Sequence, residues 1–184
     1  MAVPDSVTLR NLSGTYIMNK ELSDDTDSVL QLQGIGWVMR KAIKYSAVQL
    51  AITLKDDAQG VTEITIVQTT TGGMENTEER WTDWKEREKK DSVFGLVNGK
   101  ARWVNISEMK DEWFHKLDQK SIEAAGGEVI QTYTESVGLS GKQWTADQVW
   151  GFEIINGERR HVRRIVITRG DKVQKIRTVY DWKA

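Results

Sequence analysis

The chain contains no cysteine and a single proline, Pro4, and the lack of cysteine excludes two kinds of chemistry. Without cysteine there is neither a disulfide framework nor a thiol nucleophile. No apolar run approaches the ~20 residues that cross a bilayer, and residues 1–10 lack the apolar core of a secretion signal. We therefore expect a cytoplasmic protein without a membrane span.

Histidine and net charge are also scarce. The two histidines, His115 and His161, cannot assemble a metal cluster or a convincing catalytic triad, and each is interpreted as a surface side chain. Lys and Arg number 26 against 27 Asp and Glu, so no positive field attracts a nucleic acid. The glycine-rich pieces lack the spacing of a phosphate-binding loop. No metal, cofactor or nucleic acid is expected, and no oligomeric state is predicted.

Strand patterns dominate what is present. The length suits one domain, residues 1–184, with a buried core. Residues 48–54 alternate between larger apolar side chains and small or polar ones, which is typical of a half-buried strand, and similar segments recur to the end of the chain. Tight two-residue turns are predicted at Asn98-Gly99 and Asn156-Gly157, and a loop over residues 138–141.

Helices are predicted in two places. Ser23-Asp24-Asp25 supplies an N-cap and acidic first-turn residues, and Gly34 and Gly36 then separate two short amphipathic segments. Residues 107–125 carry apolar side chains at helical spacing, which predicts one inserted helix. About nine or ten strands with hairpin connections favour an all-β fold, a closed antiparallel β-barrel, because closure removes the sheet edges. The first two helices would form a helix-turn-helix lid.

Several motifs resemble the calycin superfamily. Leu12-Ser13-Gly14-Thr15-Tyr16 resembles the opening strand of the intracellular fatty-acid-binding proteins, with Tyr16 where tryptophan is usual, and residues 34–42 resemble their second portal helix. Residues 22–27 and 144–153 are similar to a group of fungal lipocalin-like proteins, and the wider group in fungal biosynthetic pathways includes cofactor-free cyclases. The resemblance implies a lidded barrel that encloses a hydrophobic small molecule.

The last strand departs from the fatty-acid binders in its polar anchor. They typically end in Arg-x-Tyr, whose side chains share a face and hold a carboxylate, whereas Thr178 stands at the arginine position before Tyr180. Pairing the last two strands symmetrically about Gly170 places Arg164 on the face of Tyr180, which makes Arg164 the candidate interior cation. A register different by one residue would place Arg164 outside instead. An interior guanidinium needs a partner or an oxyanion, because an unpaired buried charge costs several kcal/mol.

Two functions remain open. One is a carrier that buries a lipophilic metabolite in the barrel cavity. The other is a cofactor-free cyclase or isomerase of the pericyclase kind, acting on a polyketide- or terpenoid-like metabolite in secondary metabolism. The altered anchor, the extra length and the aromatic content favour the cyclase slightly. A filled barrel that acts only as an interaction module is a third alternative.

The candidate residues follow from the expected interior of the barrel. The catalytic candidates are Arg164, Tyr180 and Glu153, and the alternation along its strand leaves open whether Glu153 lies on the inner or the outer face. Large aromatics supply walls and hydrogen-bond donors for a hydrophobic ligand. The expected ligand-binding side chains are Tyr16, Trp37, Trp81, Trp103, Tyr133, Trp150, Phe152 and Thr178.

Overall fold

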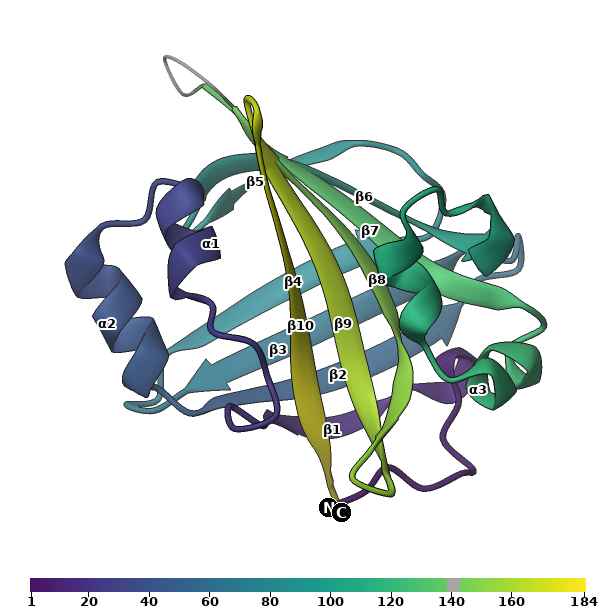
Figure 1. Cartoon of the computed structure of the whole chain (residues 1–184). Coiled ribbons are helices and arrows are strands. Elements are labelled where there is room, and N and C mark those ends of the chain that lie inside the picture. The colour runs from purple at the N-terminus through teal and green to yellow at the C-terminus, as the bar shows by residue number, and fades with distance from the viewer. Residues whose placement is uncertain (139–142) are drawn as a thin grey trace.

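A computed structural model describes residues 1–138 and 143–184 of the chain (Figure 1). In that part ten strands form one antiparallel sheet in the order β4-β3-β2-β1-β10-β9-β8-β7-β6-β5. The strands are β1 (Gly14–Met18), β2 (Val48–Asp56), β3 (Thr62–Thr70), β4 (Glu75–Trp81), β5 (Arg87–Asp91), β6 (Gly95–Asn105), β7 (Glu128–Ser136), β8 (Trp144–Ile155), β9 (Glu158–Arg169) and β10 (Lys172–Lys183). The loop predicted over residues 138–141 lies, apart from its first glycine, outside the described residues.

The sheet curls into a half-barrel (Figure 1). Its ladder of backbone hydrogen bonds ends at β4 on one side and at β5 on the other. Two hydrogen bonds connect these ends. Arg80 Nη2 of β4 donates to Thr134 Oγ1 of β7 at 3.2 Å, and the N–H of Trp84, which follows β4, donates to the Ala101 carbonyl of β6 at 2.9 Å. The predicted antiparallel sheet is thus confirmed, but in the described residues its ladder does not close into the predicted barrel; these contacts bridge its two ends.

Two short helices follow β1 and lie together beside one end of the half-barrel (Figure 1). They are α1 (Asp27–Leu32) and α2 (Trp37–Tyr45). Arg40 Nε donates to Asp27 Oδ1 at 2.9 Å and ties the helices to each other. The predicted helix pair is therefore confirmed. None of the helices that the structure describes has the length and apolar character needed to span a membrane.

The single helix predicted over residues 107–125 is wrong in detail. The segment forms two 3₁₀ turns and one short helix: Ile106–Glu108, Glu112–Lys116 and α3 (Gln119–Ala124). Each of the three begins after a side chain that accepts a backbone N–H: Asn105, Asp111 and Asp118. Because the segment has three separate N-caps, it forms three short helical pieces instead of one continuous helix. Its apolar spacing therefore reflects packing on the sheet.

One predicted turn is wrong and the other is confirmed. Asn98 and Gly99 lie within β6, paired with β5 on one side and β7 on the other. A Cβ on Gly99 would lie 3.3 Å from Arg80 Nη1, so this glycine provides space for a close approach rather than a turn. Asn156 and Gly157 have φ values of 53° and 79° and form the β8–β9 turn, since a two-residue hairpin of this type needs positive φ at both positions.

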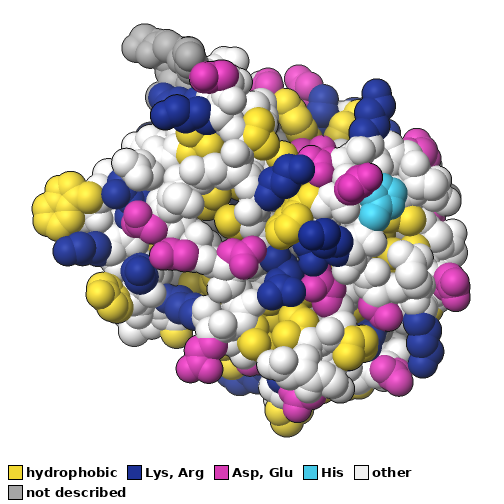
Figure 2. All heavy atoms as spheres, viewed as in Figure 1, with side chains coloured by type: hydrophobic (Ala, Val, Ile, Leu, Met, Phe, Trp, Pro, Cys, Tyr) yellow, Lys and Arg dark blue, Asp and Glu magenta, His cyan; other side chains and the backbone are white. Residues whose placement is uncertain are grey.

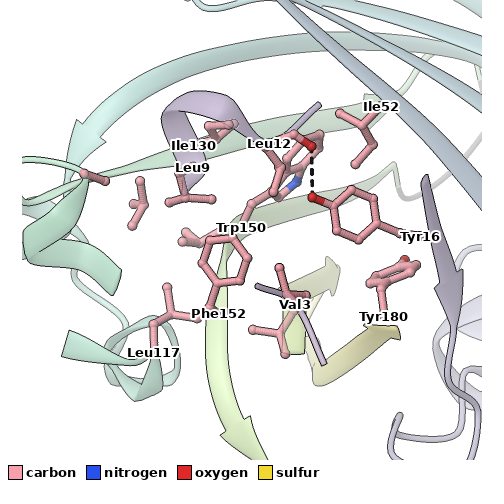
Figure 3. Packing of buried hydrophobic residues seen from close by; sticks show 14 of the residues in the cluster. Val3, Leu9, Leu12, Tyr16, Ile52, Leu117, Ile130, Trp150, Phe152 and Tyr180 are labelled. Atoms are coloured by element: carbon pink, nitrogen blue, oxygen red, sulfur yellow. Dashed lines mark hydrogen bonds between the residues drawn. The ribbon is translucent and has the colours of Figure 1, made fainter. Parts of the chain in front are cut away.

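The N-terminal segment fills part of the half-barrel and contains a 3₁₀ turn at Leu9–Asn11. Val3 and Leu12 are almost fully buried and belong to the same hydrophobic cluster as Tyr16 and Phe152 (Figure 3). The Tyr16 hydroxyl donates to the Leu12 carbonyl at 2.9 Å, which fixes the segment to β1. This region is therefore a packed plug, and room for a ligand lies elsewhere in the half-barrel.

Candidate functional site

The pairing of β9 with β10 decides which of their residues face the interior. The two strands are joined by a two-residue turn, Gly170 and Asp171, and Tyr180 therefore pairs with His161. The symmetric pairing about Gly170 that we expected is wrong by one residue, because the turn has two central residues instead of one. Since opposite residues of an antiparallel pair project from the same face, Tyr180 and His161 point inward together, and Arg164 points outward.

Of the neighbours Arg163 and Arg164, it is Arg163 that faces the interior, and not the residue that we expected. The guanidinium carbon of Arg163 lies 4.0 Å from the ring centroid of Trp150 and 5.3 Å from that of Tyr180. Thr178 is opposite it on β10, in the place where the fatty-acid binders carry arginine. The residue is only 8% exposed, and Nε and Nη2 have no hydrogen-bond partner among the described residues. Burial lowers the pKa of Arg163, since charge is costly there.

An ion pair on β4 lies close to Arg163. Glu78 and Arg80 of β4 form an ion pair, and Arg80 also donates to Thr134 across the gap between the sheet ends. Burial opposes the ionisation of Glu78, but the charges of Arg80, Lys89 and Arg163 outweigh it and hold the pKa of Glu78 below its usual range. The sequence analysis missed both residues, because an alternating charged strand does not reveal which of its charges face inward.

Glu78 and Arg80 also belong to the wall of a cavity of about 370 Å³ between β4 and the β5–β6 pair. Its volume falls in the range of small-molecule sites, which begins near ~300 Å³. The other wall residues include Trp81, Arg87, Val97, Gly99, Ala101 and Thr134. A second cavity of about 500 Å³ lies between α1 and the β9–β10 turn. Neither of these two cavities is the wide enclosed void that the barrel hypothesis predicts, because aromatic side chains fill much of the interior.

His161 lies at the centre of that aromatic packing. Its ring centroid is 5.2 Å from that of Tyr16, 5.8 Å from that of Phe152 and 5.5 Å from that of Tyr180. Figure 3 shows these three aromatic side chains and Trp150, which come from β1, β8 and β10. The surface position expected for His161 is wrong: it is 0% exposed. His115, by contrast, is exposed as expected.

The protonation of His161 follows from its partners. Nδ1 lies 3.0 Å from the Gly151 carbonyl and must donate to it, so the neutral ring presents a lone pair at Nε2. Nε2 has no partner in the part of the chain that the structure describes. Burial, with smaller contributions from the charges of Arg163 and Arg159, lowers the pKa of His161 to about 3. The side chain is therefore a neutral acceptor at physiological pH.

The remaining predicted ligand-binding side chains divide between the two faces. Trp103 packs against the core, and its Nε1 donates to Thr62 Oγ1 at 2.9 Å. Trp81 lines the cavity between the sheet ends. Trp37 is 63% exposed on α2, where Figure 2 shows hydrophobic atoms at the surface. Tyr133 pairs with Lys100 and Asp147, outside the half-barrel.

Arg164 and Glu153 form a buried ion pair on the outer face. Arg164 Nε donates to Glu153 Oε1 at 2.7 Å, and Arg177 Nη1 donates to Glu153 Oε2 at 2.9 Å. The guanidinium of Arg164 lies 4.4 Å from the ring centroid of Trp113, which belongs to the segment inserted between β6 and β7. Their catalytic candidacy depended on the inward register, so we assign these two residues a structural role, holding the insertion against the sheet.

The interior can bind and polarise a ligand. Arg163 supplies hydrogen-bond donors that are buried beside the rings of Trp150 and Tyr180, and donors are strong where the dielectric constant is low. Among the described residues there is no group of three or more His, Asp or Glu side chains placed to hold a metal ion. The buried guanidinium of Arg163, stacked on Trp150, suits binding and stabilising a polar group of a ligand.

Solved structures share this fold. Lipid binding protein 8 of Caenorhabditis elegans has a TM-score of 0.59 at 12% identity and is matched over 96% of this chain and 99% of its own. A fatty acid binding protein of Schistosoma mansoni in complex with arachidonic acid has a TM-score of 0.53 at 14% identity, over 97% of this chain and 100% of its own. At these identities the likeness shows the fold alone, which is the calycin fold.

Sequence comparison is more specific. No family model matches the chain. The fungal protein "Probable pericyclase scpY" of Mollisia scopiformis is 34% identical over 183 residues, 98% of this chain and 94% of its own. "Pericyclase pydY" of an Acremonium species is 30% identical over 184 residues, 99% of this chain and 97% of its own. Because two relatives match at this identity over nearly their whole length, the chain belongs to the calycin-like family of fungal pericyclases that contains scpY and pydY.

Proposed function

We propose that this protein binds a polyene-like polyketide or terpenoid metabolite inside the half-barrel and accelerates its pericyclic ring closure without a cofactor. The names of the two relatives support catalysis, and the lipid-binding neighbours support a hydrophobic ligand. The observation that carries the proposal is the guanidinium of Arg163, buried among aromatic rings with two unpartnered donors in the described structure.

Such a ring closure needs little from a protein beyond shape and polarisation. In a four-plus-two cycloaddition two carbon–carbon σ bonds form as two π bonds are consumed, the third π bond shifts, and no atom or proton is gained or lost. Folding the chain into a near-attack shape removes an entropic barrier. A hydrogen bond to a carbonyl oxygen conjugated with the alkene withdraws electron density, and it strengthens as charge develops in the transition state.

The residues of the interior take these roles in the proposal. Arg163 donates to the substrate oxygen, and the Tyr180 hydroxyl is a second donor from the opposite strand. Thr178 lies opposite Arg163 on β10, where a longer side chain would crowd the guanidinium. The aromatic walls in the proposal are Trp150, whose ring lies against the Arg163 guanidinium, and the partly buried Trp103. The side chains between the sheet ends then complete a closed container around the ligand.

The carrier expected as the alternative shares the binding step and differs only in turnover. Its ligand would leave the protein unchanged, whereas a pericyclic reaction yields an isomer of identical mass and different shape. The two functions are therefore distinguished by one measurement of conversion.

The test uses the metabolite that accumulates when the gene is deleted in its source organism. The purified metabolite is incubated with the protein, and products are separated by chromatography and weighed by mass spectrometry. We expect an isomer of unchanged mass to form faster than in buffer. Arg163→Met should lower kcat/KM about 10- to 100-fold, the effect of losing one charged hydrogen bond at ~1.4 kcal/mol per tenfold.

Arg164→Met is the matched control, because it removes the same side chain from the next position on the opposite face. We expect this variant to melt at a lower temperature and to keep its kcat/KM per folded molecule. Binding without conversion in the wild type would establish the carrier instead. An equal loss of kcat/KM in both variants would contradict the role of Arg163.

A further inference from the structure

Gln148 of β8 lies beside the arginine that the proposed function uses. It stands two residues before Trp150 on the same strand, so both side chains project into the half-barrel. Trp150 is opposite Arg163 in the β8–β9 pair, and Gln148 is opposite Ile165. Ile165 packs against a small hydrophobic cluster that includes Val29 of α1. Gln148 is therefore one step nearer to α1 than the guanidinium of Arg163.

The indole of Trp150 fixes the direction of the Gln148 amide. Trp150 Nε1 lies 2.6 Å from Gln148 Oε1. Because an indole N–H can only donate, the amide atom that faces it is the oxygen, and the Nε2 amino group points away with both of its hydrogens. Trp150 is 1% exposed and its ring packs against His161, so the indole, and with it the amide, is held in one direction.

The amino group of Gln148 is a donor without an acceptor. The amide oxygen is bonded to Trp150, whereas no hydrogen bond leaves Nε2 in the part of the chain that the structure describes. Gln148 is partly buried, and Nε2 is not among the unpartnered side-chain atoms that are sealed from solvent, so a ligand can reach it. A ligand that displaces water from Nε2 replaces the lost hydrogen bond only if it offers an acceptor.

Trp150 also orients the second donor of this part of the interior. The guanidinium carbon of Arg163 lies 4.0 Å from the ring centroid of Trp150, while the amide of Gln148 is bonded at the edge of the same ring system. One buried indole thus holds two donors from neighbouring strands. Donors that are already oriented need no reorganisation when charge develops on an oxygen, which is what makes them effective in a transition state.

We infer that Gln148 is a catalytic residue of the proposed ring closure, that its Nε2 donates to a neutral carbonyl oxygen of the substrate, and that Trp150 is its positioning residue. The inference rests on the proposed function for the reaction. It adds a donor on β8 and places the substrate carbonyl, conjugated with the reacting alkene, on the α1 side of Arg163. No proton is transferred: the amide N–H strengthens its bond as electron density moves onto the oxygen and is released unchanged with the product.

The first test uses Prodan, a compact neutral aromatic ketone whose fluorescence emission moves to longer wavelength when its carbonyl accepts a hydrogen bond. Gln148→Met keeps the length of the side chain without its donors, so we expect bound Prodan to emit at shorter wavelength than in the wild type. Gln148→Glu keeps an acceptor for the Trp150 N–H but has no donor when ionised, and it should shift the emission in the same direction. Gln131→Met is the matched control, because Gln131 bonds Arg102 and Asp147 on the outer face, and its emission should equal that of the wild type.

The second test measures turnover of the accumulated metabolite. Gln148→Met should lower kcat/KM per folded molecule about 3- to 10-fold, the effect of one neutral hydrogen bond, with most of the loss in kcat because the bond strengthens in the transition state. Trp150→Phe keeps a ring beside Arg163 and removes the indole N–H. It should lower kcat/KM in the wild type and lower it less in Gln148→Met, where no amide is left to orient, whereas a role in packing alone would give the same loss in both backgrounds.

Each outcome decides either the inference or the proposed function. Emission that Gln148→Met and Gln148→Glu leave unchanged would overturn the inference, and so would a wild type that does not bind Prodan. Isomerisation by the wild type with an unchanged kcat/KM in Gln148→Met keeps the proposed function and removes the catalytic role of Gln148. Binding of the metabolite without conversion, together with emission that depends on Gln148, removes the proposed function and leaves Gln148 as a donor that binds the ligand of a carrier. If Gln148→Met does not fold, Gln148→Glu takes its place in both tests.

Discussion

Replacing His161 with phenylalanine should remove a specific sensitivity of folding to acid. The folded protein keeps His161 neutral down to about pH 3, whereas an unfolded histidine takes up a proton below about 6.5. Below that pH the unfolded state binds more protons than the folded state, so the free energy of unfolding falls as pH falls. The stability at issue is fully present above the unfolded pKa and is lost toward the folded pKa.

The size of this effect follows from the two pKa values. Each pH unit between them costs up to ~1.4 kcal/mol, so lowering the pH from about 7 to about 5 should reduce the free energy of unfolding by ~2 kcal/mol through His161 alone. His161→Phe keeps a ring among the aromatic neighbours and leaves the Gly151 carbonyl without its donor. The variant is therefore less stable at neutral pH by ~1 kcal/mol, but it loses the histidine contribution to the pH slope.

Urea unfolding, followed by circular dichroism at both pH values, gives the free energy of unfolding of the wild type and of the variant. The protonation of carboxylates affects both proteins equally, so it drops out of the difference between them. His115→Gln is the control, since His115 is the other histidine and is exposed, and its slope should match the wild type. If wild type and His161→Phe lose stability equally between the two pH values, His161 is accessible to protons. The inward register of β9, and with it the placement of Arg163, would then be refuted.

Three further substitutions probe the packing around the site. Glu153→Gln leaves the buried Arg164 without a counter-charge and should lower the free energy of unfolding by ~3 kcal/mol, or the melting temperature by ~6–12 °C, with kcat/KM per folded molecule unchanged. Gly151→Ala places a Cβ 2.6 Å from Leu117 Cδ1 and should cost ~1–3 kcal/mol in urea unfolding; adding Leu117→Ala should cost less than the sum of the single changes, and strict additivity would contradict the contact. Tyr16→Phe removes a buried hydroxyl donor and should lower stability by ~1 kcal/mol, so an unchanged midpoint in denaturant would show that the bond contributes nothing.

The alternation of side chains predicted much of the fold. The strands over residues 48–54 and 148–168, the Asn156-Gly157 turn and the helix pair near the N-terminus are all found where the pattern indicates. Periodicity of two assigns residues to the two faces within one strand. It does not assign Asn98-Gly99 correctly, because the same dipeptide can form a turn or can allow another side chain to approach the backbone closely. Here the side chain of Arg80 lies next to Gly99, and the sequence pattern does not reveal its position.

The site was harder to predict, because it depends on pairing between strands. Whether Arg163 or Arg164 points inward depends on whether the β9–β10 turn contains one or two central residues, and Gly170-Asp171 allows either count. His161 was assigned to the surface because its neighbours in sequence are charged. Its burial follows from four aromatic residues, Tyr16, Trp150, Phe152 and Tyr180, that come from other strands.

Arg163 and Arg164 are consecutive residues of β9, yet one faces the interior of the half-barrel and the other faces its outside. One β-strand separates its contents from the outside, and consecutive residues serve opposite compartments. Deleting a single residue of the turn that precedes β10 would exchange the lining and the exterior along a whole strand, which no point substitution achieves. An insertion or deletion at this hairpin would therefore change many lining residues at once. It would alter the ligand specificity of the half-barrel or prevent its folding.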